Sequence, residues 1–125
     1  MDAVDVVRAY WEAANDRRWD DFAALLAEDV VYEIPQTRER VLGRDAYVRF
    51  NVEGFPGPWR LEIVEIAGGG RRAASWIDFT NSDGTNQPGI CFFELDEAGL
   101  VARITDFWPE PYEPPAQRAD LVKRY

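Results

Sequence analysis

The apolar residues change their spacing partway along this chain of 125 residues, and that change most limits the folds it can adopt. Between Val4 and Ala14 they recur every three or four positions, which predicts a helix with one buried side. From Trp59 to Trp108 they mostly alternate with polar residues, as in antiparallel strands. Helices followed by strands predict an α+β domain in which helices cover one face of a curved sheet. We expect such a sheet to enclose a cavity.

Two further helices are expected before the run of strands that begins at residue 59. Acidic residues open the first of them at residue 20, because they suit the positive end of the helix dipole. Its apolar side consists of Phe22, Leu25 and Leu26. The other helix follows Gly43, and the residues expected to face inward are Ala46, Tyr47, Phe50 and Asn51. Strands are expected over residues 30–34, 39–42, 59–67, 71–80, 90–95 and 100–108.

The composition excludes several kinds of site. The chain has no histidine and one cysteine, Cys91, so it lacks a Ser-His-Asp or Cys-His nucleophile system, histidine-ligated metals and internal disulfides. A formal net charge of -9 disfavours nucleic acid and anionic membranes as partners. No apolar run approaches the ~20 residues that span a membrane, and Asp2 and Asp5 stand where a signal peptide would be basic. We expect a cytoplasmic protein with one domain over residues 1–125, no cofactor and no metal.

Four stretches of the chain resemble the nuclear transport factor 2-like superfamily, and within it the SnoaL-like proteins. They are residues 6–10, 25–32, 43–46 and 98–101, the last leading to Asp106-Phe107-Trp108. The resemblance implies a cone-shaped fold, usually a homodimer, with a pocket for a small molecule. Members include ketosteroid isomerase, limonene epoxide hydrolase, scytalone dehydratase, polyketide cyclases and transport factors, so a shared fold does not fix the activity.

The comparison with ketosteroid isomerase concerns three positions. That enzyme needs a tyrosine and a protonated aspartate as oxyanion donors and a second aspartate as base. The resemblance places Tyr10 at the tyrosine, Ile34 at the base and Cys91 at or next to the donor aspartate. An isoleucine cannot accept a proton, and a thiol is a poor hydrogen-bond donor. Ketosteroid isomerisation by that arrangement is therefore not expected.

Asp106 is the strongest candidate for acid/base chemistry. Ile104, Asp106 and Trp108 fall on one face of the last strand, because side chains in a strand alternate. A carboxyl group among aromatic side chains is desolvated, which raises its pKa toward neutrality. The resemblance adds support, since SnoaL-like cyclases use a late-strand aspartate as general acid/base. The alternative is that Asp106 bonds Tyr10 or a backbone amide, or faces solvent.

Tyr10 is the second candidate catalytic residue, either as a donor to a ligand oxygen or as a core residue with its hydroxyl at the rim. Tyr32 is proposed as a second donor, and Asn51 as a neutral amide that orients the ligand. The other residues expected to contact substrate are Trp11, Ile34, Phe50, Cys91, Phe93 and Trp108, with Phe107 as a further aromatic wall. Arg38 and Arg40 are either an anion clamp near the pocket mouth or solvated side chains.

The outer face of the sheet and the end of the chain point to a partner. Trp76 and Asp78 alternate with the more apolar Ile77 and Phe79, so they are assigned to the outer face. An exposed stripe containing Trp76 is costly in water, and the resemblance implies that this face pairs two subunits. Residues 116–125 are expected to form a helical turn or two that packs on the body or on a partner.

Two classes of function follow. The first is a cofactor-free enzyme that performs isomerisation, dehydration, cyclisation or, less readily, epoxide opening on a small, mostly apolar oxygenated molecule. The second is a noncatalytic dimeric module that binds a ligand or assists another protein. A third alternative, a purely structural dimer, requires a cavity too small for a ligand. The catalytic hypothesis requires an open cavity and an Asp106 side chain that points into it.

Overall fold

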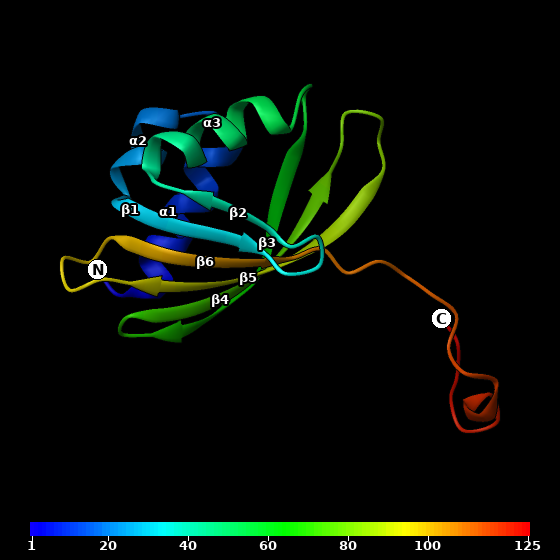
Figure 1. Ribbon diagram of the computed structural model, residues 1–125. Helices are drawn as coiled ribbons and strands as arrows, with labels where there is room; N and C mark the ends of the chain where they lie inside the picture. The colour runs from blue at the N-terminus through cyan, green and yellow to red at the C-terminus, as the bar shows by residue number, and fades with distance from the viewer.

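The computed structural model describes residues 1–125 and shows three helices packed on one face of a curved sheet (Figure 1). The helices are α1 (Ala3–Asn15), α2 (Trp19–Ala24) and α3 (Arg44–Gly54). The strands are β1 (Leu26–Ile34), β2 (Glu39–Leu42), β3 (Arg60–Gly69), β4 (Arg72–Thr80), β5 (Asn86–Leu95) and β6 (Val101–Phe107). The predicted α+β class is confirmed. None of the helices is both long and apolar enough to span a membrane.

The six strands form one open sheet in the order β2-β1-β6-β5-β4-β3. All neighbours are antiparallel except β1 and β6, which run parallel, with Tyr32 paired to Ile104. A simple antiparallel meander would not contain this pair. Its effect is to bring β1, from the first third of the chain, beside the last strand, so that residues of both contribute to one region of the inner face.

Helix α1 covers the inner face of the sheet because its apolar residues form one stripe. Asp2 caps the helix, and its carboxylate accepts a hydrogen bond from the Asp5 amide at 3.2 Å, which satisfies one of the free donors of the first turn. The buried residues of the stripe are Ala3, Val6, Val7, Tyr10, Trp11, Ala13 and Ala14. The helix packs mainly against β3 and also contacts α2, β4 and β5.

Several predicted bounds were wrong. Helix α2 ends at Ala24, and Leu26 is the fully buried first residue of β1, paired with Val101. Ala46 is exposed rather than turned inward. Strand β5 begins four residues earlier than expected and includes Gly89. A Cβ atom at that glycine would lie 3.0 Å from the Trp108 ring, so the absence of a side chain leaves room for the indole.

The two faces of the sheet differ as predicted. On the inner face of β4 both Ile77 and Phe79 are buried, whereas Trp76 on the outer face is 47% exposed. Phe107 also lies on the outer face, where its ring meets that of Phe92 with centroids 6.1 Å apart. Phe107 is therefore not a pocket wall, because the side chain of the residue after Asp106 alternates to the opposite face.

The chain leaves the body after Trp108 and extends away from it as a tail (Figure 1). The only regular structure in the tail is a 3₁₀ turn, η1 (Ala116–Arg118). The expected helical turn is present, but it does not pack on the body of its own chain.

Candidate functional site

Asp106 points into the protein from the inner face of β6 and is only 3% exposed. Its carboxylate accepts hydrogen bonds from three side chains. The Cys91 thiol donates to Oδ1 at 2.7 Å, the Trp108 indole Nε1 donates to Oδ2 at 3.0 Å, and the Tyr32 hydroxyl also donates to Oδ2. Register explains this set: Cys91 is the residue paired with Asp106 on β5, and Tyr32 comes from the parallel neighbour β1.

No cation balances this buried carboxyl group, since none of the ion pairs includes Asp106. Burial raises the pKa of Asp106, and the hydrogen bonds from Cys91, Tyr32 and Trp108 offset only part of that rise. Burial also raises the pKa of Tyr32 and of the Cys91 thiol. Both groups therefore stay protonated near neutral pH and keep donating to Asp106.

Tyr10 makes no hydrogen bond with Asp106. Its hydroxyl is hydrogen-bonded to the hydroxyl of Tyr47 on α3, and burial raises the pKa of both phenols. The Tyr47 ring stacks on Tyr32 with centroids 4.6 Å apart. Tyr47 was expected to face inward but was not proposed for the site. The only sequence signal was its place on the buried side of the third helix.

The cavity beside Asp106 is much smaller than expected. Its volume is about 30 Å³, which is near that of one water molecule. The expectation of a ligand-sized interior was wrong, because aromatic rings from four elements fill the space under the sheet. The lining residues are Tyr10, Trp11, Ala14, Tyr32, Tyr47, Asn51, Phe55, Trp59, Leu61, Phe79, Asp106 and Trp108. Every buried side-chain polar atom has a hydrogen-bond partner.

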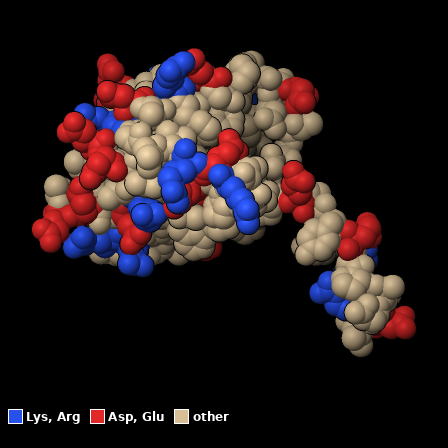
Figure 2. All heavy atoms as spheres, in the orientation of Figure 1, with Lys and Arg blue, Asp and Glu red and all other residues tan.

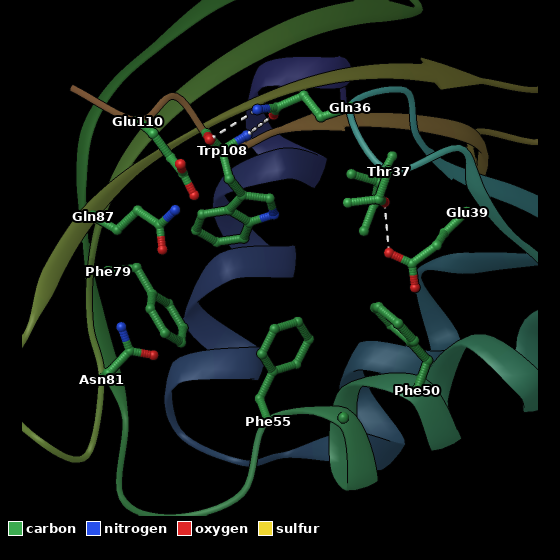
Figure 3. A pocket seen from close by; sticks show the side chains of 12 residues that line it. Gln36, Thr37, Glu39, Phe50, Phe55, Phe79, Asn81, Gln87, Trp108 and Glu110 are labelled. Carbon is green, nitrogen blue, oxygen red and sulfur yellow. Dashed lines mark hydrogen bonds between the residues drawn. The ribbon is translucent and has the colours of Figure 1, made fainter. Parts of the chain in front are cut away.

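A second, open pocket of about 340 Å³ lies outside this inner cavity (Figure 3). Phe55, Phe79 and Trp108 line both spaces, and we call these three residues the aromatic wall. The Trp108 and Phe79 rings meet edge to face with centroids 5.5 Å apart. The other residues around the outer pocket are Ile34, Gln36, Thr37, Glu39, Phe50, Gly54, Asn81, Gln87 and Glu110.

Gln36 fixes the backbone at Trp108. Its Nε2 donates to the Trp108 carbonyl at 3.1 Å, and its Oε1 accepts from the Trp108 amide (Figure 3). Gln87 and Glu110 make no side-chain hydrogen bond, so their polar atoms are available to a ligand. No arginine or lysine lines the pocket, and Arg40 is bound to Glu33 at 2.5 Å. The pocket therefore lacks the anion clamp considered for Arg38 and Arg40.

The predicted ligand-contact residues separate into two groups. Tyr10, Trp11, Tyr32, Asn51, Asp106 and Trp108 line the inner cavity, while Ile34 and Phe50 line the outer pocket. Cys91 touches Asp106 without lining either space. Phe93 is a core residue that packs on Tyr10 with centroids 5.1 Å apart. The amide nitrogen of Asn51 is bound to the Tyr47 carbonyl at 2.9 Å, so it is committed to its own helix.

The sequence did not identify Phe55, Phe79, Gln36 or Gln87 as site residues. Phe55 and Gln36 lie in connections, where no periodicity indicates a direction. Phe79 was correctly assigned to the inner face of β4 but was not recognised as part of a wall. No three histidine, cysteine, aspartate or glutamate side chains come together in a way that could hold a metal ion.

A family model for the SnoaL-like domain matches residues 7–104. The chain belongs to the SnoaL-like family. Comparison with curated protein sequences finds no match. This SnoaL-like chain is similar to a crystal structure from Kribbella flavida, of a protein provisionally named a ketosteroid isomerase. The two are 48% identical with a TM-score of 0.92, covering 98% of this chain and 88% of that one.

Two more distant structures agree on the fold. An NTF2-like protein of unknown function from Burkholderia xenovorans is 23% identical, with a TM-score of 0.79, over 97% of this chain and 93% of that one. A protein from Xanthomonas campestris provisionally named a polyketide cyclase is 27% identical, with a TM-score of 0.64, over 83% of this chain and 87% of that one. The resemblance to the nuclear transport factor 2-like superfamily is thus confirmed.

Proposed function

We propose that this SnoaL-like protein binds a small, mostly apolar oxygenated molecule from the outer pocket and transfers a proton through Asp106 without a cofactor. One observation carries the proposal: a buried carboxyl group with a raised pKa and no cationic partner lies behind an aromatic wall, next to an open pocket of about 340 Å³. A general acid/base works best when its pKa is near the working pH, and burial moves that of Asp106 in this direction.

The reaction requires the aromatic wall to open, and Trp108 is the residue that links opening to chemistry. Its indole separates the two spaces and also donates to Asp106 Oδ2 at 3.0 Å. When the ring turns away, the inner cavity joins the outer pocket and Oδ2 loses one of its two donors. The same motion therefore admits the ligand and frees an acceptor for the proton to be moved.

Tyr32 is better placed than Tyr10 to assist. The Tyr32 hydroxyl already lies at Asp106 Oδ2, whereas that of Tyr10 is bound to Tyr47. In the proposed reaction Asp106 accepts a proton from carbon next to a carbonyl and returns it to another position, while the Tyr32 hydroxyl turns from Asp106 Oδ2 and donates its one hydrogen bond to the carbonyl oxygen. Isomerisation and cyclisation are the favoured classes. Epoxide opening ranks below them, since no buried polar group beside Asp106 is free to hold a water molecule.

The outer pocket favours neutral ligands over anions. Its charged side chains are Glu39 and Glu110, and the formal net charge of the chain is -9, so an anionic ligand is repelled. The names given to the Kribbella and Xanthomonas proteins, an isomerase and a cyclase, support acid/base chemistry on a neutral carbonyl compound. We further propose a cytoplasmic homodimer, one domain per chain over residues 1–125, that pairs through the outer face of the sheet around Trp76.

Deuterium exchange tests the proposal. A panel of small neutral ketones, enones and lactones is screened by thermal shift, because a ligand that binds only the folded state raises its melting temperature. Ligands that bind are incubated with the protein in D₂O, and NMR measures deuterium incorporation next to the carbonyl. We expect exchange with the parent protein, its loss in Asp106→Asn, and its retention in the control Asp78→Asn. Exchange that persists in Asp106→Asn contradicts the role of Asp106.

Asp106→Asn is expected to fold. The amide oxygen can accept from Tyr32 and Trp108, and the amide NH₂ can donate to the Cys91 sulfur, which then accepts a hydrogen bond instead of donating one. The variant should therefore show the same ligand-induced thermal shift as the parent protein. Loss of the shift together with loss of exchange would mean that the substitution damaged the pocket, and the assignment of Asp106 as the proton carrier would be withdrawn.

The second candidate function is a noncatalytic ligand-binding module. The observation in its favour is that the inner cavity is about 30 Å³ and leaves no buried side-chain polar atom unpartnered. In that case the ligand occupies the outer pocket only. A thermal shift without deuterium exchange in the parent protein, unchanged by Asp106→Asn, would favour this function.

A further inference from the structure

The tail, residues 109–125, makes no hydrogen bond with the rest of its own chain. Its bonds join tail residues to each other, such as Arg124 Nη1 with Glu113 Oε2 at 3.1 Å. Figures 1 and 2 show it standing clear of the body. It nevertheless exposes four large apolar side chains, Tyr112, Leu121, Val122 and Tyr125. Apolar groups gathered on an otherwise polar segment indicate a contact surface.

The first part of the tail is a stiff segment that holds these apolar side chains away from the sheet of its own chain. Four of its first seven residues are proline, and proline-rich segments extend by about 3 Å per residue as stiff spacers. Residues 109–115 therefore hold the last ten residues, here called the hook, on the order of 20 Å from the body. The 3₁₀ turn and the ion pair of Arg124 with Glu113 fold the hook back against residues 109–115 rather than against the body.

The hook and the body have opposite charge. The hook contains the basic residues Arg118, Lys123 and Arg124 and one acidic residue, Asp120. The tail as a whole contains three acidic and three basic residues, so residues 1–108 carry the whole formal net charge of -9. A surface for the hook should thus be both acidic and apolar.

The outer face of the sheet has such a surface, which we call the acidic patch: Glu62, Glu65, Trp76 and Asp78. Glu62 is paired with Asp78 across β3 and β4, and Glu65 is paired with Trp76. Like charges opposite each other destabilise a sheet, and no ion pair within the chain neutralises these three carboxylates. Cations from another molecule would relieve the repulsion and cover Trp76.

We propose that the hook of one copy docks on the acidic patch of a second copy, and the second hook on the first copy, in a two-fold exchange of tails. Leu121 and Val122 then pack beside Trp76 in the interface between the two copies, while Arg118 and Lys123 meet Glu62, Glu65 and Asp78. The arrangement is isologous, because each copy gives and receives the same contact. This inference rests on the homodimer proposed above and adds the tail as the segment that fastens it.

The Kribbella crystal structure is consistent with an ordered tail. Its match covers 98% of this chain, so it includes residues beyond Trp108.

Cross-linking between differently marked chains tests the exchange directly. Ala74 lies two residues before Trp76 on the same face of β4, and Ala119 lies in the hook. Full-length Ala74→Cys and Ala119→Cys proteins are mixed and treated with a short bismaleimide, while the native Cys91 is buried. We expect a covalent species of twice the chain mass from the mixture. The control mixture of Ala119→Cys with Ala46→Cys, whose cysteine lies on exposed α3, should give none.

The strength of pairing gives a second readout. Leu121→Asp should raise the dimer Kd by at least about tenfold, because it puts a charge at the centre of an apolar contact. Leu42→Asp, at another exposed leucine, should leave Kd unchanged. Pairing should also weaken with salt, as screening reduces the attraction of Lys123 and Arg118 for the acidic patch. Analytical ultracentrifugation measures the dimer Kd of both variants and its dependence on salt.

The outcomes separate the two proposals. A parent protein that stays monomeric overturns both the dimer and the exchange of tails. A dimer whose Kd is the same in Leu121→Asp and in the parent protein, or that gives no cross-link from Ala119→Cys to Ala74→Cys, overturns the exchange and leaves the dimer standing.

Discussion

The aromatic wall divides two spaces of opposite character. On the inner side lie Asp106 and the tyrosines, with every polar atom paired and room for about one water molecule. On the outer side is a pocket about tenfold larger in which Gln87 and Glu110 have no partner. The carboxyl group proposed to transfer a proton and the pocket proposed to bind the ligand are thus adjacent but separate. Trp108 lines both spaces, so the proposed function depends on the position of its side chain.

The largest effect is expected from Tyr47→Ala, which removes a ring that lines the inner cavity and so reduces the difference in packing between the two spaces. Tyr47 is 2% exposed, and truncating a buried large aromatic residue costs about 3–5 kcal/mol of unfolding free energy. It also enlarges the inner cavity to the volume of a small ligand. Urea unfolding measures the loss. Phe50→Ala, at a half-buried outer residue, is the control and should cost clearly less; equal losses would mean that the inner space is no more tightly packed than the outer one.

Tyr32→Phe is expected to cost about 1–3 kcal/mol, since it removes a buried hydrogen bond to a carboxylate. It should also raise the pKa of Asp106 further, because one of the donors that lower it is lost. Unfolding free energy and the carbon-13 shift of the Asp106 carboxyl against pH give the two readouts. Tyr112→Phe, in the exposed tail, should change neither. An unchanged Asp106 titration in Tyr32→Phe would argue against the hydrogen bond.

Gly89→Ala is expected to push the Trp108 ring out of the aromatic wall. The overpacking should lower the unfolding free energy by about 1–2 kcal/mol. The new Cβ would lie 3.0 Å from the Trp108 ring and 3.1 Å from Ile77, so the indole must shift. The readout is the Trp108 Nε1–H resonance, which should move as its bond to Asp106 lengthens, with tighter binding of the best ligand from the panel. Gly69→Ala has free space around its Cβ. Gly69→Ala should therefore leave the indole resonance in place. An equal change in both variants would mean that the shift in Gly89→Ala does not come from contact with Trp108.

Gln36→Ala is expected to cost about 0.5–1 kcal/mol, because its two bonds to the Trp108 backbone are exposed to solvent. Its main effect should be on hydrogen exchange, which becomes faster at the Trp108 amide. Gln87→Ala, which removes a side chain without hydrogen bonds, should leave that amide unchanged. Slow exchange in both variants would show that other contacts hold Trp108.

The smallest expected effect is a change of the unfolding free energy with pH. The pKa of Asp106 is raised in the folded chain, and in the unfolded chain it is about 4. Between these values the folded state holds a proton that the unfolded state has released, so the unfolding free energy falls as pH rises through this window and is level above it. The difference between the parent protein and Asp106→Asn isolates this contribution. A difference that increases with pH would mean that hydrogen bonds to the carboxylate outweigh its burial.

The sequence predicts much of this arrangement, and what it leaves out has physical causes. The inward direction of Asp106 follows from the period of two in a strand, and the outer position of Trp76 follows in the same way. The closed wall depends instead on how rings from three separated segments fill one space. Phe55 lies in a connection, and its direction is set by packing that no local pattern encodes. Gly89 was expected to lie outside the strand, although it makes room for Trp108.

The parallel pairing of β1 with β6 also determines how late in folding the site can form. Tyr32 and Asp106 are 74 residues apart in sequence, and contacts of such separation form late because closing a long loop costs entropy before any contact repays it. During synthesis β1 can pair with β2 early, but its other edge stays without β6 until nearly the whole body has left the ribosome. A chain that ends before residue 106 therefore contains Tyr10, Tyr32 and Tyr47 but lacks the carboxyl group to which Tyr32 donates.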